Sequence, residues 1–248
     1  MRILILGGTT QASQLARALA GRDDVSPILS LAGRTQNPLP VPIPSRIGGF
    51  GGVDGLVAFL RAEKIDLVVD ATHPFAAQMS AHAYAACQRA KIPLLVFSRP
   101  AWTPGECDQW TEVADMEAAV AALGATPRRV FLTQGRLQLA AFAAAPQHFY
   151  LVRAIDEPAE LALLPRHKFV SARGPFALED ELALMRDENI ACLVTKNSGG
   201  EATSAKLLAA RILGVPVVVV ARPPGGDAEQ ASRLEEVLRW LEAHRPTP

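Results

Sequence analysis

Residues 3–12 read ILILGGTTQA, and this stretch decides the fold. A continuous apolar run that contains isoleucine and ends at glycine is typical of a strand buried on both faces. The next segment places Ala12, Leu15, Ala16 and Leu19 on one stripe of a helix. Strand, glycine turn and helix, in this order, predict the first unit of a parallel α/β sheet.

The turn between this strand and helix is a candidate phosphate site. Gly7 and Gly8 let the backbone approach a pyrophosphate closely, and Thr9 and Thr10 stand where the first helical turn offers its unpaired amides. The pattern differs from the usual G-x-G-x-x-G, and any tight β-α turn favours glycine. A purely structural turn is therefore the alternative interpretation.

Composition narrows the classes of function. The chain has 248 residues, with 25 Lys+Arg against 25 Asp+Glu, so no general attraction to nucleic acid or to acidic membranes is expected. Three widely spaced cysteines offer neither a disulfide framework nor a C-x-x-C pair. No run approaches the roughly 18 apolar residues of a membrane helix. These features predict a soluble, cytoplasmic protein.

A second expected strand, residues 26–32, ends at Gly33 and Arg34. In NAD-binding folds an acidic residue usually stands at this point and binds the 2′-hydroxyl of the ribose. The sequence has an arginine there instead, and a guanidinium suits a 2′-phosphate. Arg34 therefore favours NADP, with an exposed loop arginine as the alternative.

A proline-rich connector, residues 37–44, leads into a glycine-rich run and a helix expected from about residue 53 to residue 63. The run contains Gly48, Gly49, Phe50 and Gly51, and its backbone can pass close to a flat ligand. A loop that is merely mobile is the alternative.

The next expected strand, residues 65–71, opens into Thr72, His73, Pro74 and Phe75 before a helix that reaches about residue 90. Ligands of an open parallel sheet lie beyond the carboxyl ends of its strands, which is where Asp70, Thr72 and His73 would stand. No third metal ligand follows at a suitable spacing, so no metal site is expected.

From about residue 129 the β-α pattern starts again, after a joint at residues 101–110. The sequence therefore predicts two Rossmann-like α/β domains, each a mainly parallel sheet flanked by helices, with a cleft between them. The expected division is residues 1–98 for the cofactor domain and residues 99–248 for the substrate domain. The last residues, 227–244, are expected to form one amphipathic packing helix.

Loops after the strands of the second half carry cations and small polar residues. In a chain without net charge, such a collection on one rim predicts an anion site for carboxylates or phosphate. Scattered surface charge is the alternative. The residues in question are Thr133, Gln134, Arg153, Arg173, Lys196, Asn197 and Ser198.

Taken together, these motifs resemble the precorrin-6A reductase family of cobalamin biosynthesis. The specific matches are the segments DATHPFA at residues 70–76 and TKNSG at residues 195–199, joined by ILILGGT, RPAW, TQG and RGPF in the same order. The resemblance implies NADPH-dependent reduction of one double bond of precorrin-6A, giving precorrin-6B, with the macrocycle in the cleft. It also makes other enzymes of that pathway candidate partners.

On this resemblance each motif receives a role. The pyrophosphate is assigned to Gly7, Gly8, Thr9 and Thr10, and the 2′-phosphate to Arg34. The residues from Gly48 to Gly51 would cover the cofactor, while Thr72, His73 and Phe75 would flank the nicotinamide. Thr72 and His73 are the catalytic candidates, with solvent as the other proton source. Arg99 joins the seven rim residues as a candidate substrate ligand.

Two other classes of NADP-binding protein are alternatives. A short-chain carbonyl reductase needs a tyrosine followed four residues later by lysine, whereas Tyr84 is followed by Gln88 and Tyr150 by Ala154. A non-catalytic NADP-binding sensor would use the same first half, and the cationic rim argues against it. Whether the macrocycle contains cobalt stays open.

Overall fold

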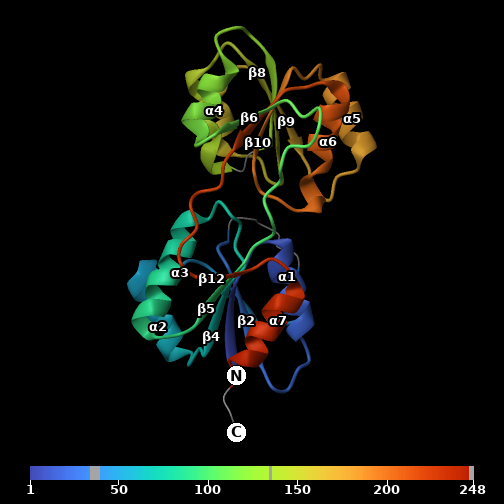
Figure 1. Ribbon diagram of the computed structural model, residues 1–248. Coiled ribbons are helices and arrows are strands. Elements are labelled where there is room, and N and C mark those ends of the chain that lie inside the picture. The colour runs from blue at the N-terminus through green and yellow to red at the C-terminus, as the bar shows by residue number, and fades with distance from the viewer. Residues whose placement is uncertain (34–39, 134–135, 246–248) are drawn as a thin grey trace. The chain divides into compact units, whose positions relative to one another are not determined.

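The computed structural model describes residues 1–33, 40–133 and 136–245 and divides into two compact units (Figure 1). The first unit joins Met1–Pro100 to Pro223–Pro248, and the second is Ala101–Arg222. Each unit contains one six-stranded sheet in which every strand pair is parallel. Two Rossmann-like α/β units are therefore confirmed.

The sheet of the first unit has the strand order β12-β5-β4-β1-β2-β3. Its strands are β1 (Arg2–Leu6), β2 (Ser26–Leu31), β3 (Ser45–Ile47), β4 (Leu67–Asp70), β5 (Leu94–Phe97) and β12 (Glu229–Ala231). In β1, residues 3–6 are buried, as the continuous apolar run predicts for a central strand. The carboxyl ends of β1, β2 and β4 therefore meet at one edge.

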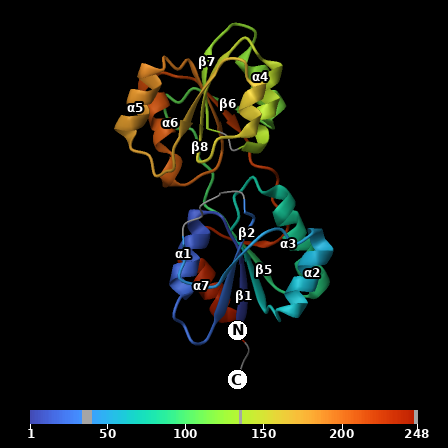
Figure 2. The ribbon, with the colours of Figure 1, turned by 180° about the vertical axis from the view of Figure 1, so that it is seen from behind.

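Helices cover both faces of this sheet (Figure 2). One face packs against α1 (Thr10–Leu19) and α7 (Leu234–Ala243), through a core that includes Ile3, Leu15 and Val237. The other face packs against α2 (Gly52–Ala62) and α3 (Ala77–Ala90), with Leu4 and Leu60 in its core. Helices on both faces bury β1 in the middle of the sheet, and the turn that follows β1 lies at the carboxyl edge.

The sheet of the second unit has the order β6-β11-β10-β7-β8-β9. Its strands are β6 (Trp110–Val113), β7 (Arg129–Leu132), β8 (Phe149–Ala154), β9 (His167–Ser171), β10 (Cys192–Lys196) and β11 (Val217–Val220). The helices are α4 (Met116–Leu123), α5 (Leu178–Asp187), α6 (Ala205–Leu213) and the 3-10 segments η1 (Arg136–Ala144), η2 (Ala159–Leu163) and η3 (Glu201–Thr203). Leu193, Phe131 and Leu207 belong to the core on the α5–α6 face.

The C-terminal segment differs from the sequence expectation. Residues 227–244 were expected to form one helix of the second domain, but Glu229–Ala231 forms strand β12 and pairs with β5 of the first sheet. The helix begins only at Leu234. Assigning residues 223–248 to the substrate domain is therefore wrong, because this segment completes the sheet and core of the first unit. Part of the expected joint is also a strand, since Trp110 begins β6.

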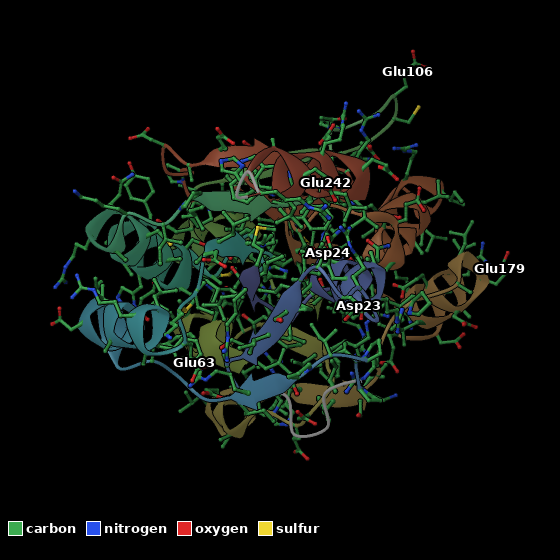
Figure 3. All side chains as sticks on the ribbon, turned by 90° about the horizontal axis from the view of Figure 1, so that it is seen from below. Asp23, Asp24, Glu63, Glu106, Glu179 and Glu242 are labelled. Atoms are coloured by element: carbon green, nitrogen blue, oxygen red, sulfur yellow. The ribbon has the colours of Figure 1, made fainter. Side chains whose placement is uncertain are left out.

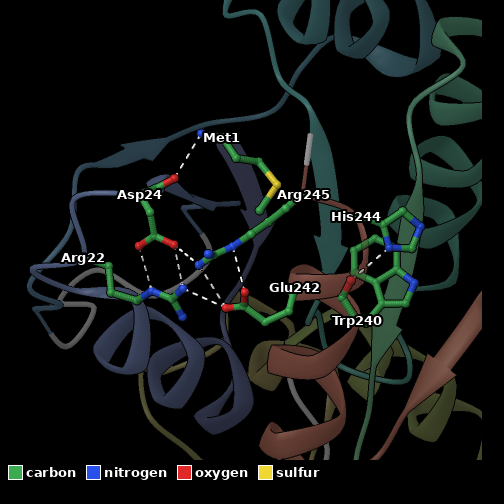
Figure 4. A network of polar contacts seen from close by, with 7 residues as sticks. All are labelled: Met1, Arg22, Asp24, Trp240, Glu242, His244 and Arg245. Atoms are coloured by element: carbon green, nitrogen blue, oxygen red, sulfur yellow. Dashed lines mark hydrogen bonds and ion pairs between the residues drawn. The ribbon is translucent and has the colours of Figure 1, made fainter. Parts of the chain in front are cut away.

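A polar network holds the last helix against the first unit. Asp24 accepts hydrogen bonds from Arg22 and Arg245, and both arginines also contact Glu242 of α7 (Figure 4). The amino group of Met1 donates to the backbone oxygen of Asp24. Figure 3 shows Asp24 and Glu242 from below, beside the segment that enters β2. The network joins Met1 and Arg245 to the loop that contains Asp24.

In the part of the chain that the structure describes, no helix is long and apolar enough to cross a membrane. No group of three His, Cys, Asp or Glu residues that could hold a metal ion is found there either. All three cysteines are free thiols. Burial raises the pKa of Cys87 to about 12 and that of Cys192 to about 11.

Candidate functional site

The glycine turn after β1 is shaped by two different constraints. A side chain on Gly7 would bring its Cβ to 2.4 Å from Leu29 Cδ1 and 3.2 Å from Ala12 Cβ, so strand β2 and helix α1 leave no room for one. Gly8 has a φ of +112°, and a Cβ there would meet nothing within 4 Å. Glycine is therefore required at Gly7 by the close packing of its neighbours and at Gly8 by the positive φ of the backbone. The space beside Gly8 is open.

Thr9 connects this turn to the neighbouring strand. It caps α1, because its Oγ1 accepts from Ala12 N at 3.2 Å, and the same hydroxyl donates to the backbone oxygen of Ala71 at 2.7 Å. The first turn of α1, which starts at Thr10, contains no acidic residue. The first-turn amides and the positive end of the helix dipole therefore suit an anion.

Asp70 ends strand β4 and is 2% exposed. Its Oδ1 accepts hydrogen bonds from Thr72 N at 3.0 Å and from Thr72 Oγ1 at 2.7 Å. Its Oδ2 is buried and has no hydrogen-bond partner within the described residues. Because the hydroxyl hydrogen of Thr72 is directed at Asp70, Thr72 presents lone pairs and acts as an acceptor.

His73 lies in the loop that follows. Its Nδ1 accepts a hydrogen bond from Phe75 N at 3.2 Å, and its backbone oxygen accepts from Ala76 N at 2.7 Å. The rings of His73 and Phe75 are 5.8 Å apart between centroids. With Nδ1 accepting, the hydrogen of the neutral imidazole resides on Nε2. Both residues are partly buried.

Arg99 follows β5 and lies in the first unit. Its Nη1 donates to Gln11 Oε1 at 3.0 Å, and Gln11 belongs to the first turn of α1. The structure therefore brings this cation beside the glycine turn, although sequence reasoning assigned it to the substrate. Positive charge at this place adds to the attraction of the helix N-terminus for an anion.

Arg46 is a residue of this edge to which sequence reasoning assigned no role. It lies in β3, and its guanidinium contacts Ser30 of β2, the glycine-rich run and the ring of Phe50. The run thus packs around Arg46 within the first unit. The available signal was an arginine directly before the glycines, but its relation to β2 depends on strand pairing.

Two expected site residues, Arg34 and Gln134, lie outside the described residues. Of the others in the second unit, Thr133 follows β7, Arg153 lies in β8, Arg173 follows β9, and Lys196 ends β10. These four strands are neighbours in one parallel sheet, so their carboxyl ends share one edge. Thr133 Oγ1 donates to Val194 O at 3.3 Å, which holds its side chain toward β10.

Arg153 is buried instead of lying open on this rim. Both of its terminal nitrogens donate to the carboxylate of Glu181, and the two side chains are 7% and 1% exposed. Its guanidinium carbon lies 3.7 Å from the ring centroid of Phe176 and 4.9 Å from that of Phe131. Its charge is therefore compensated inside the unit. Glu181 gave no sequence signal beyond being one of three acids in the first turn of α5.

Asn197 is also committed to internal contacts. Its Oδ1 accepts from Trp102 N at 2.8 Å, and its Nδ2 donates to Trp102 O at 2.9 Å. Arg222 donates to the backbone oxygens of Asn197 at 2.8 Å and of Ser198 at 2.9 Å, and burial lowers the pKa of Arg222. These contacts fix the loop after β10, which follows Lys196 and contains Ser198.

Comparison with known proteins gives a family match over nearly the whole chain. The model of the family "Precorrin-6x reductase CbiJ/CobK" matches residues 2–242. The chain is 49% identical to the precorrin-6A reductase of Rhodobacter capsulatus, covering 100% of this chain and 98% of that protein. It is 51% identical to that of Rhodococcus erythropolis, covering 97% of both chains.

A more distant relative and a solved structure also match over nearly the whole chain. The cobalt-precorrin-6A reductase of Priestia megaterium is 27% identical, with 96% of this chain and 97% of that protein covered. A solved structure of a CobK precorrin-6A reductase has a TM-score of 0.94 at 49% identity and covers 100% of this chain and 98% of its own.

Proposed function

This chain belongs to the CbiJ/CobK precorrin-6x reductase family, and from that premise we propose that it uses NADPH to reduce cobalt-free precorrin-6A, giving precorrin-6B. It is an oxidoreductase acting on a CH–CH bond, in the reduction step of cobalamin biosynthesis that its relatives name. The identity of about half over the full length carries this assignment. The choice of NADPH and the residue roles below are inferred from the site.

The first unit fits a dinucleotide at the carboxyl edge of its sheet. Gly8 leaves open space above the turn, and the first turn of α1 carries no acid. The residues that would hold the cofactor are Gly7, Gly8, Thr9, Thr10, Arg34, Gly48, Gly49, Phe50, Gly51, Thr72 and Phe75. When bound, NADPH supplies the hydride for the conjugated macrocycle.

Thr72 and His73 are the residues assigned to the reacting end of the cofactor. Asp70 fixes the Thr72 hydroxyl as an acceptor, which suits the amide hydrogens of a carboxamide. The proton that completes the reduction comes either from solvent or from His73 in its imidazolium form, which becomes neutral imidazole when it gives up the proton. If His73 delivers it, His73→Asn lowers kcat about 100-fold, whereas delivery from solvent leaves kcat nearly unchanged.

The second unit is assigned to the carboxylates of the macrocycle. Lys196 and Arg173 would supply charge at the edge formed by β7 to β10, with Thr133 and Ser198 as hydrogen-bonding groups. Arg99 of the first unit and Gln134, which lies outside the described residues, are further candidate ligands. Arg153 and Asn197, which sequence reasoning placed among the ligands, support this edge through Glu181 and Trp102.

Cobalt-free precorrin-6A is preferred as substrate because relatives near 50% identity are named precorrin-6A reductases. Relatives named for the cobalt-containing substrate are only 26–27% identical. The deciding experiment offers purified protein both macrocycles, each with NADPH or NADH, under anaerobic conditions. We expect NADPH oxidation coupled to loss of precorrin-6A; a protein that binds NADPH but never oxidises it with either macrocycle would be a sensor.

A further inference from the structure

Arg46 lies at the carboxyl end of β2, in the edge strand β3. Ser30 and Arg46 are register partners in this parallel pair, and Leu31 of β2 pairs with Ile47. Strand β2 lies directly beside β1, whose end carries the glycine turn. In dinucleotide-binding sheets the end of this second strand contacts the ribose of the adenosine half.

The guanidinium of Arg46 is held in place by neutral groups. Its Nη1 donates to Ser30 Oγ at 2.8 Å and to Gly48 O at 3.0 Å, and its Nη2 donates to Gly49 O at 3.1 Å. Its carbon Cζ lies 4.1 Å from the ring centroid of Phe50 and 5.2 Å from that of Phe59. The guanidinium is therefore held both by strand β2 and by the glycine-rich run.

Within the described residues no carboxylate forms an ion pair with Arg46, although several other arginines there form such pairs. Arg153, in contrast, forms a buried pair with Glu181. A guanidinium has five N–H groups, and the three hydrogen bonds to Ser30, Gly48 and Gly49 use three of them. The Nε hydrogen and one Nη2 hydrogen are left, which is the number that a bidentate contact with a phosphate requires.

We propose that Arg46 recognises the 2′-phosphate of NADPH and is a determinant of the preference for NADPH over NADH. This proposal rests on the proposed function and deepens it. Ala32 and Gly33, which follow β2, supply no carboxylate for a 2′-hydroxyl, and a fixed cation comes instead from the adjacent strand. Stacking on Phe50 orients the planar fork toward one edge, as bidentate recognition needs.

The test measures dissociation constants of NADPH and NADH for the full-length protein by titration calorimetry, so it does not depend on turnover. Arg46→Gln removes the charge, and Arg61→Gln, which alters an exposed arginine of α2, is the matched control. We expect Arg46→Gln to raise the Kd of NADPH about tenfold or more, with a much smaller change for NADH. Arg61→Gln should leave both constants unchanged.

An equal loss of affinity for both dinucleotides would overturn the proposal, because it would mean that Arg46 only supports the glycine-rich run. Unchanged NADPH binding would overturn it as well. Should Arg46→Gln fail to fold, Arg46→Lys keeps the charge but loses the planar fork, and a partial loss of the NADPH preference is then expected. A full retention of that preference in Arg46→Lys would refute bidentate recognition.

Adenosine 2′,5′-bisphosphate and 5′-AMP separate this proposal from the proposed function, because neither contains nicotinamide. If the parent protein prefers the bisphosphate, Arg46→Gln abolishes that preference, and precorrin-6A is not reduced, then only the proposed function fails. If precorrin-6A is reduced with NADPH while Arg46→Gln retains the preference, then only the role of Arg46 fails. An Arg34→Gln variant measured in parallel shows how the two arginines share the phosphate.

Discussion

The buried pair of Arg153 and Glu181 gives a prediction whose size follows from the structure. In Glu181→Leu the guanidinium stays buried without its carboxylate, because the two side chains are only 7% and 1% exposed in the parent protein. Removing one partner of a buried ion pair costs about 3–5 kcal/mol, and stacking of Arg153 on Phe176 places the expected loss near 3 kcal/mol. Replacing both residues by apolar ones, Arg153→Met with Glu181→Leu, should recover most of this loss.

The assay is urea unfolding of the second unit. Trp102 and Trp110 belong to that unit and Trp240 to the first, so a Trp240→Phe background makes tryptophan fluorescence report on the second unit. With a slope of about 2 kcal/mol per molar urea, a loss of about 3 kcal/mol lowers the midpoint by roughly 1.5 M. The reasoning is refuted if the double variant is as unstable as Glu181→Leu, or if the single variant loses less than about 1 kcal/mol.

The same double variant tests whether Arg153 binds substrate. If Arg153 only supports the rim, the KM for precorrin-6A should stay close to the parent value once stability is recovered. A large rise of KM in the stable double variant would instead return Arg153 to the list of substrate ligands.

Three further predictions concern other parts of the molecule. Gly8→Ala should lower the melting temperature and weaken NADPH binding in a calorimetric titration, because a φ of +112° strains alanine by about 1–3 kcal/mol. Glu236 accepts hydrogen bonds from the backbone of Ser232 and Arg233, which lower its pKa to about 2. The stabilising effect of the Glu236 carboxylate is therefore present at neutral pH and lost as pH falls from 4.5 toward 2. The melting temperatures of the parent protein and of Glu236→Gln should converge over this pH range. A difference in melting temperature that stays constant with pH would contradict the prediction. Iodoacetamide should modify Cys107 alone in the folded protein, since the other two thiols are buried with raised pKa values, and mass spectrometry of labelled peptides would reveal any other product.

The parts of the fold that sequence predicts well are those coded locally. The run from Ile3 to Leu6, the glycines after it and the stripe of α1 lie within about twenty residues, so periodicity alone places them. Strand β12 was missed because three residues carry no periodic signal, and its pairing with β5 joins segments far apart in the chain. The domain boundary was misplaced for the same reason.

The candidate site shows a similar division. Asp70, Thr72 and His73 could be placed at a strand end from sequence, because the carboxyl edge of a parallel sheet follows from strand order alone. The side chains and strands that contact a candidate residue, and so determine its role, could not be predicted from the sequence. Arg153 is buried in an ion pair only because Glu181 faces it from α5, and Arg46 contacts Ser30 only because β3 pairs with β2.

The return of the chain to its first unit has a consequence for biosynthesis on the ribosome. Residues 101–222 form a continuous insert, whereas the first sheet receives its last strand and α7 only from residues after 223. Domains commonly fold in order of emergence from the ribosome. Here the N-terminal unit is completed only after residues 101–222 have been synthesised, and until Val237 and Leu241 follow, the nascent polypeptide exposes the apolar core residues that they cover.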